Sequence, residues 1–528
     1  MQKHNMRTEK KSSIKNSATR LVLIALLVLI QTGWMVFLML KLNAYSTAIT
    51  LTLTFIAVFI ALKIFGTHVN SAQRMPWLIV ITAVPFFGIC IYLLFGRSIV
   101  TKGMRRRFNG IESDILVNKL SQDETVIDEI AAKDKGIANQ CRYISHTARY
   151  PVYKNTDVEY YAEADISFAA QIEELKKAEH FIFMEYHAIE DALSFERLKK
   201  VLIEKAQSGV EVRIFYDDLG SIFFLNKEFI KRMREQGIQC RVFNPLKVVV
   251  NMFMNNRDHR KITVIDGRVG FTGGYNLADE YFNITHPYGY WKDTGIKLTG
   301  DAVRSLTASF LTMWNAIDHT DSQADYDKYL DAADNTYKAV DSECYVQPYS
   351  DNPLGQDRIG EDVYLNILKN AKDYVYITTP YLIITDEMER ELRLAVKRGV
   401  DVRIVTPGIP DKKMVYKITR SYYEPLCSAG VRIYEYTPGF CHAKQWVSDD
   451  EVSVVGTINM DFRSLYLHFE NAVFTYNKGL AAKVKKDMLN NFEEGREVTK
   501  DYAKDYAKDV IRPLKLGTCI LRMISPLL

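Results

Sequence analysis

Cysteines are few in this sequence, and their spacing matches neither a metal site nor a set of disulfide bonds. Seven are scattered over 528 residues, without a C-x-x-C pair and without a His/Cys cluster at zinc spacing. A cluster of acidic metal ligands is missing as well. We therefore expect reduced thiols, which suit a main body in the cytosol, and no disulfide framework.

A strong imbalance of charge is also missing. The 68 lysines and arginines against 64 aspartates and glutamates leave a net charge of +4, which does not indicate a nucleic-acid binder. The hydrophobic fraction of 48% and the charged fraction of 25% fit a folded protein. The length predicts two or three domains.

Long hydrophobic runs are present in the first hundred residues, at 21–40, 44–62 and 76–96. They predict a multi-pass transmembrane module, with a buried core hairpin as the alternative for the second and third runs. A cleaved signal peptide does not fit, because the apolar length is too great and no small-residue cleavage site is evident. Basic residues flank the module on both sides, which places both flanks and the following body in the cytoplasm. That requires an even number of crossings, whereas three runs are present. Either one run is interfacial or re-entrant, or one flank breaks the rule.

After residue 100 the chain changes to alternating helices and strands, which predicts an α/β sandwich with a largely parallel sheet. A polar, helix-like connector comes first (112–135). The order helix, glycine, strand then occurs twice, with Val210 corresponding to Val400, 190 positions later. This indicates a tandem duplication of domain-sized units. We predict a transmembrane module over 1–100, a connector over 101–150, a first α/β domain over 151–335, and a second over 336–528 that ends in a helix.

Both copies carry one polar motif. "HRKITVIDGRVGFTGGYN" contains His259, Lys261 and Asp266, and "HAKQWVSD" repeats their spacing. The second set is His442, Lys444 and Asp449, and the glycine and asparagine downstream also match, as Gly273 with Gly456 and Asn276 with Asn459. A lone His-x-Lys in a strand is usually the solvated side of a sheet. Five shared positions disfavour that interpretation, because histidine, lysine and asparagine are poor choices for a scaffold alone.

Two such copies in a pseudo-twofold arrangement can surround one phosphodiester. One imidazole attacks phosphorus and forms a phosphohistidine, while the other protonates the leaving alkoxide and then serves as the base. The lysines and the asparagines Asn276 and Asn459 hold the non-bridging oxygens. With two ammonium groups present, we expect neither a metal nor a cofactor.

Further carboxylates complete the predicted site. Each histidine needs an acceptor on its other nitrogen, and Asp293 follows the first motif while Glu470 follows the second. The alternative for both is a surface carboxylate. Asp266 and Asp449 belong to the catalytic motif by spacing, but we expect them to bond backbone N–H groups of a turn.

The paired H-x-K-x(4)-D motifs with G-x-x-N resemble the phospholipase D superfamily. "RDHRKITVIDGRVGFTGGYNLADEYFN", "YWKDTG", "GTINMDFRSLYLHFENA" and the terminal "ISPLL" are similar to its bacterial cardiolipin synthases. The resemblance implies two tandem phospholipase D-like domains in a cell-membrane enzyme that joins two phosphatidylglycerol molecules into cardiolipin and releases glycerol. It also implies that His259 is the nucleophile and His442 the general acid. Where the superfamily often has serine in G-S-x-N, this chain has Gly274 and Thr457.

Other functions remain as alternatives. A phospholipase D or another phosphatidyltransferase would use the same ten positions. The apolar runs and the modest charge argue against a nuclease and a nucleic-acid partner, and two intact motifs argue against a membrane scaffold. Residues 246–257 fit a loop that meets acyl chains or an ordinary packed loop, and the tail 511–528 fits core packing or the membrane interface. The oligomeric state is left open.

Overall fold

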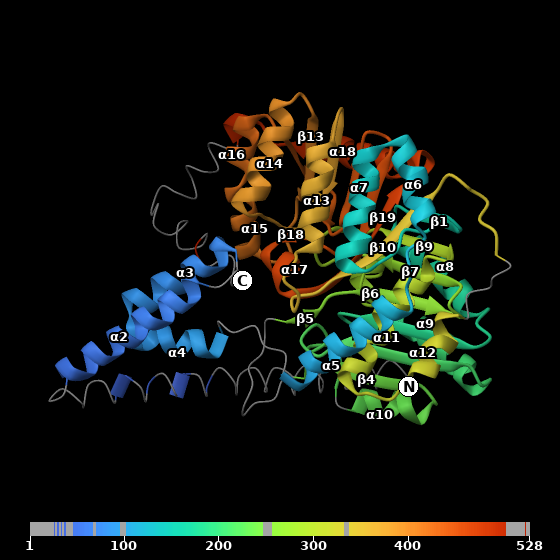
Figure 1. Ribbon diagram of the computed structural model, residues 1–528, viewed down its shortest axis with the longest axis horizontal. Helices are drawn as coiled ribbons and strands as arrows, with labels where there is room; N and C mark the ends of the chain where they lie inside the picture. The colour runs from blue at the N-terminus through green and yellow to red at the C-terminus, as the bar shows by residue number, and fades with distance from the viewer. Residues whose placement is uncertain are drawn as a thin grey trace.

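The computed structural model describes residues 46–66, 70–95, 102–226, 228–245, 256–331 and 337–502, together with residue 523 and a few isolated positions between 26 and 37. The described part consists of a body built on two β-sheets, one above the other in Figure 1, and a group of three helices that projects from one side of it. Most of the first hydrophobic run, the loop at 246–255 and all of the tail after residue 502 except residue 523 lie outside the described residues.

The first sheet has seven strands in the order β1-β9-β7-β6-β2-β3-β4. These strands are β1 (Thr156–Tyr161), β2 (Phe181–Tyr186), β3 (Glu211–Asp217), β4 (Gln239–Phe243), β6 (Lys261–Ile265), β7 (Val269–Gly273) and β9 (Gly295–Gly300). The helices of this half are α8 (Ala164–Leu175), α9 (Leu193–Gln207), α10 (Glu228–Glu235), α11 (Val303–Ile317) and α12 (Gln323–Leu330).

The second sheet repeats this order as β10-β19-β17-β16-β11-β13-β14 and adds β20 at the edge. Its strands are β10 (Tyr345–Asp351), β11 (Tyr374–Thr378), β13 (Asp401–Pro407), β14 (Arg432–Tyr436), β16 (Gln445–Ser448), β17 (Val452–Gly456), β19 (His468–Tyr476) and β20 (Gly495–Glu497). Its helices are α13 (Ile359–Asn370), α14 (Asp386–Lys397), α15 (Lys413–Ser421), α16 (Tyr423–Ala429), α17 (Phe462–Tyr466) and α18 (Lys478–Glu494).

The expectation of a largely parallel sheet is wrong, because both sheets are mixed. Strand β2 pairs with β3 in parallel but with β6 in antiparallel, and β6 and β7 form an antiparallel hairpin. The hairpin turns at Asp266 and Gly267, both at positive φ, a conformation that Asp-Gly adopts readily in two-residue turns. The motif-bearing strands therefore enter each sheet as hairpins and not as crossover units.

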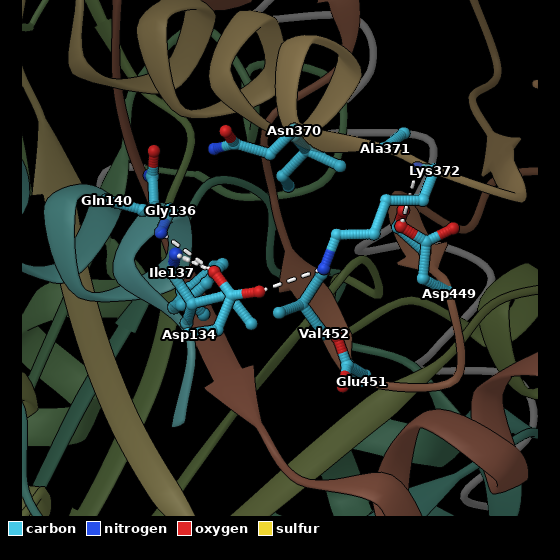
Figure 2. Close-up of a pocket in the computed structure, with 13 residues that line it drawn as sticks. Asp134, Gly136, Ile137, Gln140, Asn370, Ala371, Lys372, Asp449, Glu451 and Val452 are labelled. Carbon is cyan, nitrogen blue, oxygen red and sulfur yellow. Dashed lines mark hydrogen bonds and ion pairs between the residues drawn. The ribbon is translucent and has the colours of Figure 1, made fainter. Parts of the chain in front are cut away.

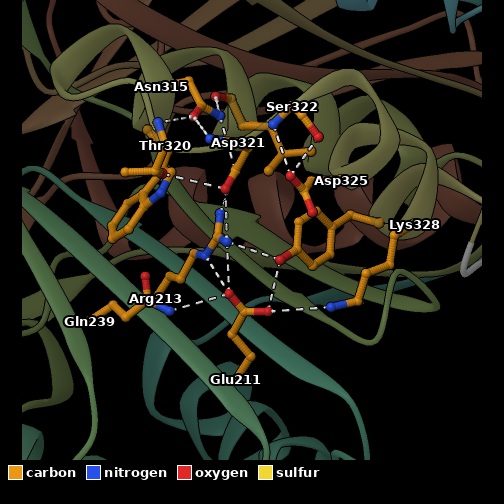
Figure 3. A network of polar contacts seen from close by, with 12 residues as sticks. Glu211, Arg213, Gln239, Asn315, Thr320, Asp321, Ser322, Asp325 and Lys328 are labelled. Carbon is orange, nitrogen blue, oxygen red and sulfur yellow. Dashed lines mark hydrogen bonds and ion pairs between the residues drawn. The ribbon is translucent and has the colours of Figure 1, made fainter.

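Burial follows the alternation of side chains along the strands. In β2, Phe181 and Phe183 enter one core with α11, whereas Ile182 and Met184 enter a second core with α8 and α9. The first of these cores continues without interruption into the second sheet. Figure 3 shows how Arg213 on β3 fixes the segment after α11, because its guanidinium donates to Asp321 at 2.6 Å and to the Tyr329 hydroxyl at 2.9 Å.

The predicted connector packs on the body. Helices α5 (Lys102–Glu112), α6 (Glu124–Lys133) and α7 (Lys135–Tyr143) place apolar residues such as Phe108 and Ile127 in the main core. Arg107 donates to the backbone oxygen of Ala316, and Arg105 donates to that of Leu354. These two arginines, which follow the apolar runs, therefore also hold α5 against the body.

The projecting helices are α2 (Ser46–Phe65), α3 (Ser71–Ala83) and α4 (Pro85–Phe95). Among the described residues, α2 is the one helix long and apolar enough to cross a membrane, over Thr47–Phe65. The third hydrophobic run is broken between α3 and α4, because Pro85 starts a new helix. A Cβ on Gly88 would lie 2.4 Å from the Val80 oxygen, so that α4 folds closely onto α3.

Candidate active site

Two short strands hold the halves together and place the motif histidines. Strand β5 (Arg257–Asp258) pairs with the start of β19, and β15 (Gly439–Cys441) pairs with β8 (Tyr290–Lys292). Each pairing joins one half to the other. His259 follows β5 and donates its N–H to the Phe469 oxygen at 2.9 Å, and His442 follows β15 and donates to the Lys292 oxygen at 2.7 Å.

Each histidine is oriented by a carboxylate of the opposite half. The Nδ1 atom of His259 lies 2.9 Å from the Glu470 carboxylate, and that of His442 lies 2.6 Å from Asp293. Both carboxylates are fully buried. A carboxylate acceptor fixes the proton on Nδ1, which leaves Nε2 of each neutral ring for chemistry. The structure thus brings both sequence-predicted carboxylates to the histidines, in a crossed arrangement.

The motif lysines share the strand face of the histidines. Each ammonium donates to the backbone oxygen of its own histidine, Lys261 to His259 at 2.6 Å and Lys444 to His442. Both side chains are buried. Burial lowers the pKa of Lys261 to about 7 and that of Lys444 to about 8. An anion bound between the two lysines would therefore raise the pKa of both and stabilise their charged forms.

The two motif asparagines differ in their partners. Both polar atoms of the Asn276 amide have protein partners, since its oxygen accepts from the Ala188 N–H at 3.1 Å and its nitrogen donates one of its two hydrogens to the Tyr281 hydroxyl at 2.8 Å. The buried Oδ1 of Asn459 has no hydrogen-bond partner among the described residues. The Asn459 oxygen is therefore not held by the protein as the Asn276 oxygen is.

Asp266 and Asp449 lie away from the histidines. Each sits at the far end of its motif strand, about 15 Å along the chain from the lysine. Asp266 accepts three backbone N–H groups at 2.8 Å, from Glu179, His180 and Phe181, and Asp449 accepts three at 2.9 Å from 372–374. Figure 2 shows Asp449 beside Lys372 in a separate cavity of about 240 Å³ under α7 and α13. These aspartates tie the start of β2 and β11 to the motif hairpins.

Thr457 and Gly274, which stand where G-S-x-N has serine, each lie against one of the two carboxylates that orient the histidines. The Thr457 hydroxyl donates to Glu470 at 2.5 Å, so that the second copy keeps a hydroxyl on its carboxylate. In the first copy a Cβ on Gly274 would lie 2.1 Å from Oδ1 of Asp293. Glycine is therefore required where aspartate approaches the backbone.

The surroundings of the two histidines differ, which sequence reasoning did not anticipate. The ring of His259 has two more imidazoles beside it, His187 at 5.0 Å and His468 at 5.5 Å between centroids. The ring of His442 has Trp291 at 5.3 Å and Tyr281 at 5.4 Å. One side of the site is lined by imidazoles and the other by aromatic rings. The sequence carries a weak signal of this difference: when Asp293 is aligned with Glu470, Trp291 of the first copy corresponds to His468 of the second.

Electrostatics favour neutral imidazoles before an anion binds. Burial and the neighbouring lysines lower the pKa of His442 to about 3 and take that of His259 well below its usual value. Burial alone would raise the pKa of Asp293, but His442 and Lys444 outweigh it and keep that carboxylate ionised. A bound phosphodiester would add a negative charge and raise the pKa of every one of these bases.

The site also contains a donor set that could hold a metal ion. Ligand atoms of His259, His468 and Glu470 all lie within 4.8 Å of one another. The charges of Lys261 and Lys444 lower the pKa of His259, so both lysines lie close enough to repel a divalent cation bound there. With two ammonium groups this close, the donor set fits a divalent cation poorly.

The affinity for an anion is expected to fall as the pH rises. Lys261 and Lys444 are charged below about pH 7 and about pH 8, and the charge is lost above these values. Binding of diethyl phosphate, whose charge is constant in this range, should weaken about tenfold or more between pH 6 and pH 9. Calorimetry of the purified chain measures it. In Lys444→Met the step near pH 8 should be lost, and an affinity that does not change with pH would contradict this account.

Comparisons with known proteins agree with the geometry. The family model described as "Cardiolipin synthase, PLD-like domain" matches residues 171–314 and 364–493, and "Phospholipase_D-nuclease N-terminal" matches residues 52–97. An "Uncharacterized protein" of Streptococcus mutans is 39% identical, over 88% of this chain and 99% of that protein. A "Cardiolipin synthase" of Halalkalibacterium halodurans is 32% identical, over 94% and 95%, and one of Geobacillus thermodenitrificans is 33% identical, over 92% and 94%.

Among solved structures, phosphatidylserine synthase of Haemophilus influenzae superposes with a TM-score of 0.54. It is 15% identical, and the superposition covers 73% of this chain and 99% of that one. At this identity the likeness establishes the fold alone.

Proposed function

The chain belongs to the cardiolipin synthases of the phospholipase D superfamily, a group of phosphatidyltransferases, and we propose that its two motifs form one site that works through a phosphohistidine. In that site a phosphatidyl group passes from one phosphatidylglycerol to a second, glycerol leaves, and cardiolipin forms. The observation that carries the proposal is the crossed pairing of His259 with Glu470 and of His442 with Asp293. Neither half can orient its own histidine without the other.

We assign the nucleophile to His259 and the general acid to His442. His259 is held strongly neutral by burial, by the lysines and by its neighbouring imidazoles, so that its Nε2 lone pair is free to attack. His442 faces the ionised Asp293, which favours its imidazolium once an anion has bound. Asp266 and Asp449 then act through the hairpins they anchor, and Asn276 and Asn459 through the non-bridging oxygens.

Two displacements follow. Nε2 of His259 attacks phosphorus, the bond to the glycerol oxygen breaks, and the His442 imidazolium gives its proton to that oxygen. His442 next takes the proton of the acceptor hydroxyl, the acceptor oxygen attacks phosphorus, and the bond from phosphorus to His259 breaks. Lys261 and Lys444 hold the charge on the non-bridging oxygens in both steps.

A second candidate is a phospholipase D or another phosphatidyltransferase, which would share the first displacement. The acceptor of the second displacement separates them: water gives phosphatidic acid, and a small alcohol gives another headgroup. A lipid acceptor is favoured because enzyme and acceptor are confined to one surface, which raises the effective concentration.

Vesicles of phosphatidylglycerol alone are expected to yield cardiolipin and glycerol in equal amounts, with phosphatidic acid as a minor product, in a buffer that contains EDTA. Lipid mass spectrometry with a parallel glycerol assay measures the ratio. Dominant phosphatidic acid would make the chain a hydrolase, and a need for an added alcohol would make it another transferase.

Lost turnover in EDTA on a soluble short-chain substrate, restored by magnesium, would contradict the lysine-based account.

The membrane arrangement is also a proposal. At 1.5 Å per residue, α3 and α4 reach about 20 Å and 17 Å, short of the ~30 Å hydrocarbon core, whereas α2 suffices. We propose that residues 21–40 and α2 cross the membrane and that α3 and α4 form a re-entrant hairpin. Two crossings then agree with cytoplasmic flanks, with domains divided near residues 100, 150 and 335.

A cysteine introduced at residue 110 is expected to resist a membrane-impermeant thiol reagent in intact cells, because the body lies inside. The same cysteine should react after the cells are made permeable. Labelling of intact cells would place the body outside and contradict this topology.

A further inference from the structure

The aromatic side of the site continues away from His442 as a wall of rings. Phe440 lies 5.7 Å from the His442 ring, and Tyr381 lies 6.3 Å from Phe440. The Tyr381 hydroxyl donates to Asp411 at 2.6 Å, and the Lys412 ammonium lies 5.5 Å from the Tyr381 ring. The wall therefore leads from the reacting imidazole to the segment that precedes α15.

That segment is apolar and basic on its exposed side. Ile409 is 40% exposed and Met414 is 55% exposed, high values for large apolar side chains. Lys413 and Lys417 are exposed four residues apart, on one face of α15. The opposite face holds the helix to the body through buried Ile418 and Thr419.

An exposed aromatic residue lies on the other side of the site as well. Gly220 packs against His187, the neighbour of His259, because a Cβ there would lie 2.2 Å from the His187 oxygen. Phe223, in the same loop, is 47% exposed. The loop that packs against the neighbour of His259 therefore also carries an exposed apolar side chain.

Helix α15 lies on the side of the body from which α2, α3 and α4 project (Figure 1). Asn70, directly before α3, donates to the Tyr466 hydroxyl on α17 at 3.1 Å. Strand β18 (Met460–Asp461), just before α17, pairs with β12 (Leu382–Ile383). The Leu382 N–H in turn bonds the hydroxyl of Thr419 on α15. A short chain of contacts therefore connects the helical module to α15.

We propose that residues 409–417 and Phe223 form a docking rim that rests on an anionic bilayer, so that the site opens directly onto lipid. The proposal rests on the proposed function, since it explains how lipid substrates reach His442. Ile409, Met414 and Phe223 enter the boundary between headgroups and acyl chains, and the lysines pair with lipid phosphates. A bilayer fits better than a protein partner, because the rim is linked to membrane-type helices and its charge complements anionic lipid.

The docking rim is tested on the full chain in nanodiscs, with Cys90→Ser, which removes a half-buried cysteine, and Cys519→Ser, which removes the one cysteine outside the described residues. Met414→Cys carries the fluorophore NBD, and Val340→Cys, at a position 93% exposed, is the control. In phosphatidylglycerol nanodiscs the label at 414 should shift to the blue and be quenched by doxyl lipid. Phosphatidylcholine should weaken both effects, and the control should show neither. Equal signals at 414 and 340 would overturn the docking rim, whether or not the chain turns over lipid.

A second arm compares two forms of substrate. In Lys413→Gln/Lys417→Gln, the ratio of turnover on phosphatidylglycerol vesicles to that on a monomeric short-chain analogue should fall about fivefold for each lysine lost, because a lysine near an anionic surface contributes about 1 kcal/mol. Lys486→Gln, an exposed lysine on α18, is the matched control. An unchanged ratio would count against the docking rim. A wild-type chain without cardiolipin product would instead overturn the proposed function, and the fluorescence would still decide the docking rim.

Discussion

Replacing either His259 or His442 with alanine is expected to lower cardiolipin formation by about 10⁴-fold or more, because residues that act as one catalytic unit fail together. Both imidazoles serve one phosphorus atom, and each is held by a carboxylate of the other half. The double variant should therefore be no worse than either single one. Initial rates on phosphatidylglycerol vesicles measure all three.

His146→Ala is the matched control, since His146 is an exposed histidine outside the site. Its turnover should equal that of the wild type, and thermal melting should show that all variants fold. Near-normal activity in either single variant would contradict one composite site, as would two partial losses that multiply in the double variant.

Asp293→Asn is expected to reduce turnover by about 10³- to 10⁴-fold, because an amide can hold His442 in the wrong tautomer and cannot stabilise its imidazolium. Gly274→Ala should disturb the same contact between Asp293 and His442, since the added methyl would lie 2.1 Å from the Asp293 carboxylate. Steady-state rates over a range of pH measure both effects, and the alkaline limb of the profile, which reports the protonated His442, should move to lower pH.

Gly110→Ala controls for the glycine change, because nothing lies within 4 Å of the added methyl on α5. This variant should keep full turnover. If Asp293→Asn and Gly274→Ala both turned over like the wild type while folding normally, Asp293 would not orient a catalytic histidine.

The sequence predicts the components of the site better than their connections. The repeated spacing identifies both histidines, both lysines and both asparagines, because period-two alternation in a strand places residues i and i+2 on one face. The crossed pairing of His259 with Glu470 is different. It depends on β5 joining β19 between the halves, a two-residue pairing that leaves no pattern in the sequence.

The fold shows a similar division. The α/β class and the doubled order follow from alternating helices and strands, whereas the mixed sheets depend on a two-residue turn at Asp266 and Gly267 that reverses the chain into a hairpin. Hydropathy finds the third apolar run, but its break between Ala83 and Pro85 depends on proline starting a new helix. The imidazole and aromatic linings depend on residues far apart in the chain.

The most direct test uses a phosphatidyl ester of p-nitrophenol, a leaving group that needs no general acid. His442→Ala should release one equivalent of p-nitrophenol in a burst and then stall, and peptide mass spectrometry at alkaline pH should find the phosphoryl adduct on His259. His259→Ala should give no burst. An adduct on His442 in the wild type would exchange the two roles, and cardiolipin formed with no adduct on either histidine would contradict the phosphohistidine mechanism.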